Sequence, residues 1–251
     1  AGHAANTIVG AIFDAAAAVA STFGDRLSSS DGVDQSEARR ALDAAVTNPG
    51  EGRIEAGVFE AQAAAECHVA YSQGLPDHIL VFDMGAGTTD VTAFERGGTD
   101  GAPVMRELAN ARQSVMLGCD EIDKILVRYI FDQMKLSGAN AKKSWRRLML
   151  RSRRLKEDLF QSGVIETVVG GRKVRVRLGE FSRDRQLVAF IASLSHLFRT
   201  SLNQIGMRAV AAGKDEIGVV LAGGGSTLPF IQKMAARTRP SVARIRNVRV
   251  Q

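Results

Sequence analysis

The stretch ILVFDMGAGTTDV, residues 79–91, predicts two β-strands joined by a glycine turn. Its first four residues are apolar and partly β-branched, which indicates a buried strand that ends at Asp83. Gly85 and Gly87 then turn the chain, and residues 90–96 alternate between apolar and polar side chains, as a second strand does. We therefore expect strand, tight turn and strand, with an acidic residue where the first strand ends.

The turn and its flanking residues have the chemistry of a phosphate and metal site. Glycines let the backbone approach a ligand closely, and their successive amide hydrogens suit a phosphate. Thr88 and Thr89 can donate hydroxyl hydrogen bonds to phosphate oxygens. Asp83 and Asp90 can hold magnesium through its water molecules. A glycine turn between strands is usually only a hairpin, so this stretch alone leaves both interpretations open.

A second glycine-rich loop lies between a predicted buried strand, residues 217–222, and a predicted helix, residues 228–236. Glycines at this place permit close contact with a flat base or ribose, and the free amides of a helix N-terminus favour negative charge. A tight turn is the alternative for this loop taken alone. The loop consists of Gly223, Gly224, Gly225 and Ser226.

Together and in this order, the two stretches resemble motifs of the superfamily that joins the seventy-kilodalton heat-shock chaperones, actin and sugar kinases. The match is closest to the chaperones: residues 79–91 look like their second phosphate motif, with Ala86 where a third glycine is usual, and residues 217–233 look like their adenosine motif. Three further stretches fall in the order that the family predicts, namely 60–65 (EAQAAA), 117–123 (LGCDEID) and 155–159 (LKEDL). The resemblance implies an α/β fold of the actin-like ATPase (ribonuclease H-like) type.

The resemblance also implies ATP or ADP with Mg²⁺ as cofactors, and roles for particular residues. Asp83 would orient or deprotonate the attacking water, and Thr88 would contact the terminal phosphate. The phosphates would be cradled by Gly85, Ala86, Gly87, Thr88 and Thr89, and the metal would be held by Asp83, Asp90 and Glu60. The rest of the nucleotide would bind against Gly118, Cys119, Lys156, Gly223, Gly224, Gly225 and Ser226.

The chain departs from the family's motifs at positions that concern the nucleotide. Arg153 stands where the family has an acidic adenine contact and Glu157 where it has an arginine, which bears on base selectivity. Cys119 replaces a glycine, and Ala61 replaces a proline of the family's conformational relay. Neither the family's first phosphate motif, Asp-x-Gly-Thr-Thr, nor its lysine for the terminal phosphate can be placed in the sequence.

We expect the complete protein to bind ATP and hydrolyse it slowly, as the nucleotide-binding domain of a heat-shock chaperone-like protein with a co-chaperone or exchange factor as partner. We expect the 251-residue chain alone to bind nucleotide weakly without turnover, and no client-peptide site is visible in it. One alternative is a scaffold module of the same fold, which binds nucleotide without hydrolysing it or binds no nucleotide. Another is a kinase or filament-forming relative, against which the basic hairpin described next argues.

The remaining sequence predicts mostly helices and one hairpin. The hairpin is formed by residues 164–169 and 173–178 around Gly170-Gly171, with one apolar and one basic face. We expect residues 1–76 to be a mostly helical remnant of a first lobe and residues 77–251 to be the second lobe. Helices are predicted over 6–23, 36–46, 62–73, 121–134, 141–160 and from 183 up to Gly213, and further strands over 53–59 and 104–109.

The net charge of +6 would suit a nucleic acid if the basic residues gathered on one face. Many of them fall within the predicted helix 141–160, interleaved with apolar residues. A solvated helix face explains this pattern more simply than binding to a phosphate backbone, so we expect no nucleic-acid partner.

The sequence also predicts a location and excludes several kinds of site. No apolar run approaches the ~20 residues that a membrane-spanning helix needs, and no secretory signal is present. Cys67 and Cys119 suggest neither a disulfide framework nor a zinc site, so we expect a cytoplasmic protein. Motifs of P-loop nucleotidases, serine hydrolases and zinc proteases are absent from the sequence.

Overall fold

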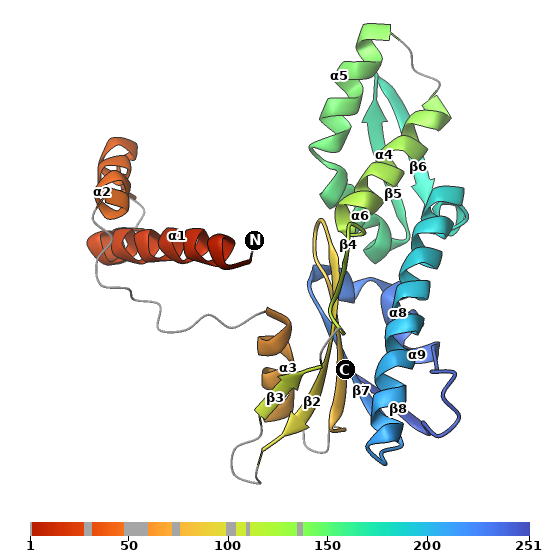
Figure 1. Ribbon diagram of the computed structural model, residues 1–251. Coiled ribbons are helices and arrows are strands. Elements are labelled where there is room, and N and C mark those ends of the chain that lie inside the picture. The colour runs from red at the N-terminus through yellow and green to blue at the C-terminus, as the bar shows by residue number, and fades with distance from the viewer. Residues whose placement is uncertain are drawn as a thin grey trace. The chain divides into compact units, whose positions relative to one another are not determined.

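The computed structural model describes residues 2–27, 32–47, 60–71, 76–98, 104–108, 111–134 and 138–251 (Figure 1). The chain forms two compact units, Ala1–Val58 and Phe59–Gln251. The strand predicted over 53–59 lies outside the described residues. The division into residues 1–76 and 77–251 therefore stays a prediction about the lobes, while the structure assigns residues 60–71 to the same unit as the sheet.

The first unit is a pair of helices joined by a short turn of 3-10 helix. It contains α1 (Gly2–Phe23), η1 (Gly24–Leu27) and α2 (Gln35–Thr47), which confirms the two helices predicted there. Both terminal nitrogens of Arg26 bind the carboxylate of Glu37 at 3.0 Å, which ties η1 to α2. Asp34 accepts hydrogen bonds from the backbone amides of Ser36 and Glu37 and so caps the start of α2.

The second unit is built on a six-stranded mixed sheet in the order β3-β2-β1-β7-β8, with β4 also paired to β2. Strands β1, β2 and β3 run antiparallel, whereas β7 is parallel to β1 and β8 is parallel to β7. Because β1 and β7 are parallel, the loops that follow them leave the sheet at the same edge. The strands are β1 (His78–Met84), β2 (Thr89–Gly97), β3 (Val104–Glu107), β4 (Gln113–Val115), β7 (Glu216–Ala222) and β8 (Asn247–Val250).

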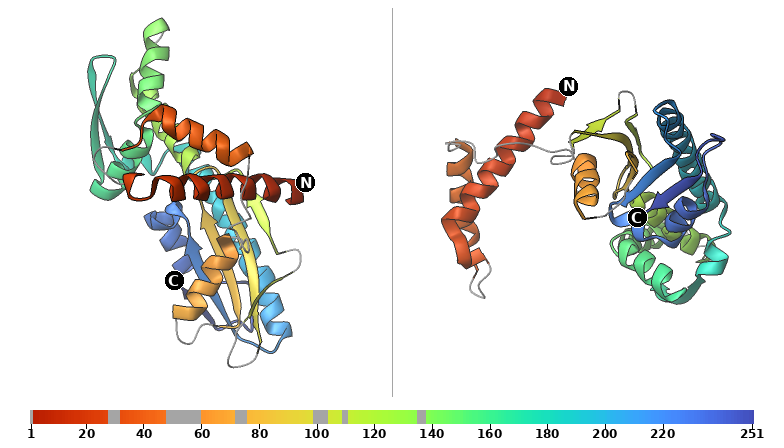
Figure 2. Two further views of the ribbon diagram at one scale, coloured as in Figure 1. Left: turned by 90° about the vertical axis from the view of Figure 1, so that its left-hand side faces the viewer. Right: turned by 90° about the horizontal axis from the view of Figure 1, so that it is seen from below.

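Helices cover both faces of the sheet, and for this reason every residue of β1 is buried. On one face, Leu80 and Phe82 belong to a core shared with α8 (Arg185–Ala211) and α9 (Pro229–Arg237). On the other face, Ile79 and Val81 pack against α3 (Glu60–Tyr71), whose alanines allow a close approach. Figure 2 shows α3 on one side of the strands and α8 on the other.

A helical and hairpin extension continues from the sheet edge at which β1 and β7 end (Figure 1). The hairpin β5 (Val164–Val169) and β6 (Arg172–Arg177) turns at Gly170 and Gly171, which both have positive φ as a two-residue turn requires. Its apolar face is buried and its basic face is exposed, as predicted. The helices of the extension are α4 (Cys119–Met134), α5 (Gly138–Met149), α6 (Ser152–Ser162) and α7 (Leu178–Phe181).

The single helix predicted over residues 141–160 is wrong, because the chain breaks between α5 and α6. The amide of Arg151 donates to the carbonyl of Leu148, and the Ser152 hydroxyl donates to the carbonyl of Met149 at 2.7 Å. These bonds replace the regular helical pattern and close α5. The second hairpin strand was predicted to end at Leu178, but Leu178 is the first residue of α7. The short strands β4 and β8 were not predicted. None of the helices in the described ranges is long and apolar enough to span a membrane.

Candidate functional site

The two glycine-rich loops meet at the edge where the parallel strands β1 and β7 end. In register, Asp83 at the end of β1 lies beside Ala222 at the end of β7. A side chain at Gly223 would collide with Asp83 and with the carbonyl of Met84, so the loops touch each other at this point. In open α/β sheets, ligands bind outside the carboxyl ends of parallel strands, which makes this edge the natural place for a site.

The turn after β1 is fixed from one side by the start of α4. The amides of Cys119 and Asp120 donate to the carbonyls of Gly85 and Ala86 at 3.1 and 2.8 Å. The Thr89 hydroxyl donates to the carbonyl of Leu117 at 2.6 Å. The start of α4 thus binds the turn through the turn's carbonyl oxygens.

Three successive amides of the same turn have no hydrogen-bond partner among the described residues. Within the described ranges, the backbone N–H groups of Ala86, Gly87 and Thr88 make no hydrogen bond, whereas that of Gly85 donates to the Thr88 carbonyl at 2.9 Å. These three successive amides are therefore available as donors to a ligand.

Carboxylates surround this turn. Asp83 is 8% exposed and lies directly opposite Asp90 in the β1–β2 register. Burial raises the pKa of Asp83 most, and the nearby charges of Glu60 and Asp90 raise it further. The Thr88 hydroxyl donates to the Asp90 carboxylate at 2.9 Å. Sequence positions 60, 83, 88 and 90 are thereby brought together.

Direct metal coordination by these side chains is not supported. Among the described residues, no three His, Cys, Asp or Glu side chains gather closely enough to hold a metal ion. Asp83, Asp90 and Glu60 therefore do not form a preformed three-ligand site, and their part in holding hydrated magnesium stays a prediction.

Apart from Gly85, where an added Cβ atom would make only an ordinary contact with the carbonyl oxygen of Thr88, the glycines of the site fall into two groups. At Gly118, Gly223 and Gly225 a Cβ atom would collide with the β1 strand or its turn, so these glycines are needed for packing. At Gly87 and Gly224 a Cβ atom would meet nothing within 4 Å, so these two face open space. Of the predicted nucleotide-binding glycines, Gly87 and Gly224 are the ones beside which a ligand has room.

Lys156, predicted to contact the nucleotide, is buried in the protein. Its Nζ lies 2.9 Å from Oδ1 of Asp123 and donates to the carbonyl of Cys119 at 3.1 Å. This ion pair joins α6 to the first turn of α4 and holds the backbone at Cys119, whose half-buried thiol has a pKa raised by burial. Asp123 has no predicted role, although it belongs to the LGCDEID stretch.

Three further residues that the sequence analysis singles out have partners in their own helix or loop. Arg153 and Glu157 form an ion pair with each other on the exposed side of α6, with Nε and Oε1 3.0 Å apart. In the loop after β7, the Ser226 hydroxyl donates to the carbonyl of Gly223 at 2.8 Å, which folds this loop onto itself.

We expect Lys156→Met to lower the free energy of unfolding by about 3–5 kcal/mol, because it leaves the buried carboxylate of Asp123 without its partner. Burial already raises the pKa of Asp123, and Lys156 opposes this rise. Without Lys156 the pKa of Asp123 should rise further, so acid would neutralise the unpaired charge. The loss of stability should thus be largest at neutral pH and shrink as the pH falls.

Urea unfolding at neutral and mildly acidic pH measures this effect. Arg153→Met is the matched control, because it breaks an exposed pair on the same helix and should change stability little. Equal losses in the two variants would contradict a special role for the buried pair.

Most of the chain is similar to one known protein family. A family model described as Hsp70 protein matches residues 52–239. The Chaperone protein DnaK of Endomicrobium trichonymphae is 28% identical over 191 residues, which cover 71% of this chain and 29% of that relative. The Chaperone protein DnaK of Nitrosopumilus maritimus (strain SCM1) is 27% identical over 171 residues, which cover 63% of this chain and 26% of the relative. The chain thus spans less than a third of the length of these relatives. The family match confirms the expected actin-like α/β fold, with which the mixed sheet agrees.

Proposed function

Because the chain belongs to the Hsp70 protein family, we propose that it contributes the second lobe of a nucleotide-binding domain that binds ATP and hydrolyses it slowly in the complete protein. Residues 1–76 would be the remnant of the first lobe. A co-chaperone or exchange factor would be the partner, and the cytoplasm the location. The observation that carries the proposal is the row of unpaired amides at Ala86, Gly87 and Thr88, beside the carboxylates of Asp83 and Asp90.

The phosphates would lie against the unpaired amides of the turn. These N–H groups are held in place by α4 before any ligand arrives, so they require little rearrangement to stabilise negative charge. Thr88 would contact the terminal phosphate, and its hydroxyl would then leave the hydrogen bond to Asp90. Asp83, at the end of β1, would orient or deprotonate the attacking water.

The carboxylates also support a magnesium site. Negative charges at Glu60 and Asp90 raise the pKa of Asp83, so a cation nearby would relieve an unfavourable concentration of charge. Asp83, Asp90 and Glu60 would hold the ion through water, and magnesium would offset the charge of the phosphates when bound.

The loop of residues 223–226 would receive the adenosine, with Gly224 facing it. Lys156 is engaged with Asp123 and would act by holding the backbone at Cys119. The Arg153–Glu157 pair would adjoin the base. Its exchange of charges relative to the family pattern favours one alternative, a scaffold module of the same fold, with or without bound nucleotide, that does not hydrolyse ATP. Measured hydrolysis in the complete protein separates the two functions.

Gly224→Val tests the adenosine assignment. The branched side chain would fill space that the base or ribose needs, so the affinity of the complete protein for Mg-ADP should fall about tenfold or more. Isothermal titration measures the change. Gly179→Val is the matched control, because a Cβ atom there also meets nothing within 4 Å but Gly179 lies in α7, away from the loop. Unaltered affinity in Gly224→Val would show that the adenosine does not bind against this loop.

A further inference from the structure

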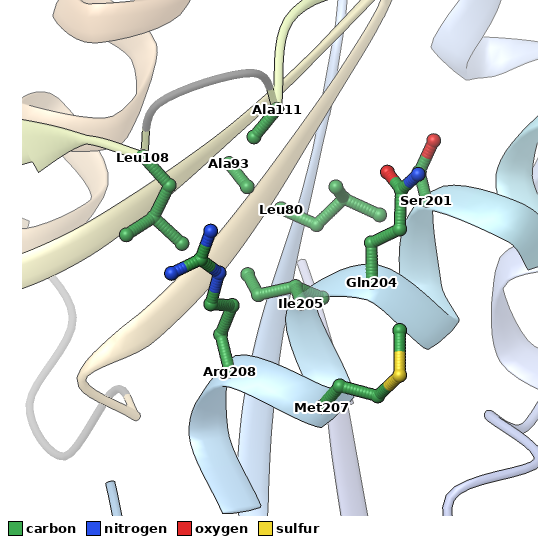
Figure 3. A pocket seen from close by; sticks show the side chains of 9 residues that line it. All are labelled: Leu80, Ala93, Leu108, Ala111, Ser201, Gln204, Ile205, Met207 and Arg208. Carbon is green, nitrogen blue, oxygen red and sulfur yellow. The ribbon is translucent and has the colours of Figure 1, made fainter. Parts of the chain in front are cut away.

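A cavity of about 340 Å³ lies between α8 and the sheet. Its floor is apolar and consists of Leu80 of β1, Ala93 of β2 and Ile205 of α8. Figure 3 shows Leu108 and Ala111 beside this floor. Small-molecule sites occupy roughly 300–1,000 Å³, so this volume suits a compound of one or two rings.

Three polar side chains of α8 line the same cavity, and each offers a hydrogen-bond donor. The Ser201 hydroxyl is buried and has no partner in the described part of the chain. Gln204 accepts a bond from Nε2 of Gln113 at 3.2 Å through Oε1, which leaves its own amide hydrogens available. Arg208 is exposed and forms neither an ion pair nor a side-chain hydrogen bond within the described ranges, so its guanidinium is free to turn toward a ligand.

These donors lie around the apolar floor. In Figure 3 the guanidinium of Arg208 reaches toward Leu108, while Gln204 and Ser201 stand on the other side of Leu80. The lining residues, all of them described, include no acidic side chain. The cavity therefore offers an apolar surface, several donors and a positive charge without a counter-charge.

We propose that this cavity binds a small, flat carboxylate. Its ring would cover Leu80, Ala93 and Ile205, and its carboxylate would accept hydrogen bonds from Arg208, whose planar guanidinium matches that group. An inorganic phosphate would leave the apolar floor uncovered, and a neutral ring would leave the arginine unpaired. The proposal does not depend on the nucleotide site, because it uses none of that site's residues.

Two probes of the same shape test the proposal on the 251-residue chain: 2-naphthoate, which carries the carboxylate, and 2-naphthamide, which is neutral. Isothermal titration should show that naphthoate binds about tenfold or more tightly than the amide, the effect of one charge-assisted hydrogen bond. Naphthoate should also raise the unfolding temperature, because it binds only the folded chain. Failure of naphthoate to bind, or equal affinity for the two probes, would overturn the proposal.

Two variants locate the binding site. Arg208→Gln should reduce naphthoate affinity about tenfold or more and leave the amide unchanged, whereas Ala111→Leu should weaken both probes by filling the cavity. Arg199→Gln is the matched control, because Arg199 is an exposed arginine of the same helix that does not line the cavity. Naphthoate affinity that survives both Arg208→Gln and Ala111→Leu would mean that the probe binds elsewhere, against the proposal. The unfolding temperature of each ligand-free variant shows whether it is folded.

Discussion

Replacement of Asp83 by Asn in the complete protein is expected to slow ATP hydrolysis about 100-fold or more and to change nucleotide affinity by less than about tenfold. The substitution removes the charge that would orient or deprotonate the attacking water. It leaves the unpaired amides of the turn in place, since these are held by bonds to α4 and not by Asp83. Single-turnover hydrolysis and equilibrium binding separate the two quantities.

Asp77→Asn is the matched control for this experiment. Asp77 precedes β1 at its opposite end and pairs with Lys214 at 2.6 Å, so its loss should leave hydrolysis unchanged. If Asp83→Asn hydrolysed ATP at the normal rate, Asp83 would have no part in the chemistry.

Asp83→Asn should also stabilise the nucleotide-free chain. Because the pKa of Asp83 is raised in the folded state, its ionisation costs stability as the pH rises through that pKa. Asn carries no charge, so Asp83→Asn should unfold at a higher urea concentration at neutral pH, and the difference should vanish as the pH falls below the usual range of an aspartate. Active-site residues often lower the stability of the folded protein, so this result would agree with the role proposed for Asp83.

Gly223→Ala is expected to lower the free energy of unfolding by about 2 kcal/mol or more. Gly223 has a φ of +74°, which a residue with a Cβ atom rarely adopts, and the added atom would collide with Asp83 and Met84. The strand ends and both loops would have to separate to accommodate it. Urea unfolding of the 251-residue chain measures the loss.

Gly224→Ala provides the comparison at the neighbouring position. A Cβ atom there meets nothing within 4 Å, so stability should hardly change. Equal stability of the two variants would show that the loops do not meet as the structure places them.

Most of the sheet could be predicted from the sequence, because its central strands have strong local patterns. Residues 79–83 are uniformly apolar up to the aspartate, and the glycine turn sets Asp83 opposite Asp90. The short strands β4 and β8, of three and four residues, were not predicted. Their pairing depends on neighbours far away in the chain.

The break between α5 and α6 escaped prediction for a different reason. Leu148 and Leu155 are seven residues apart, which is also the spacing of a continuous helix, so the apolar pattern does not mark the break. It is marked by backbone bonds and by the Ser152 hydroxyl, which a periodicity does not reveal.

The position of the buried lysine depends on tertiary structure. Lysine is usually exposed, and nothing in the sequence near Lys156 indicates that Asp123, on another helix, neutralises it. The sequence likewise predicts that the glycine loops bind a ligand, but it does not distinguish the glycines from one another. Only the packing shows that Gly87 and Gly224 face open space, whereas Gly118, Gly223 and Gly225 permit close contacts with β1 and its turn.

The two hydrogen bonds from the start of α4 to the turn have a mechanical consequence. The turn cannot shift without either breaking them or carrying the end of the helix along. α4 has 16 residues and therefore spans about 24 Å. A small tilt imposed at its first turn becomes a larger displacement at its far end, where α5 packs against it. If the turn binds phosphate as proposed, α4 would act as a lever that carries a small movement of the turn to the far end of the second unit.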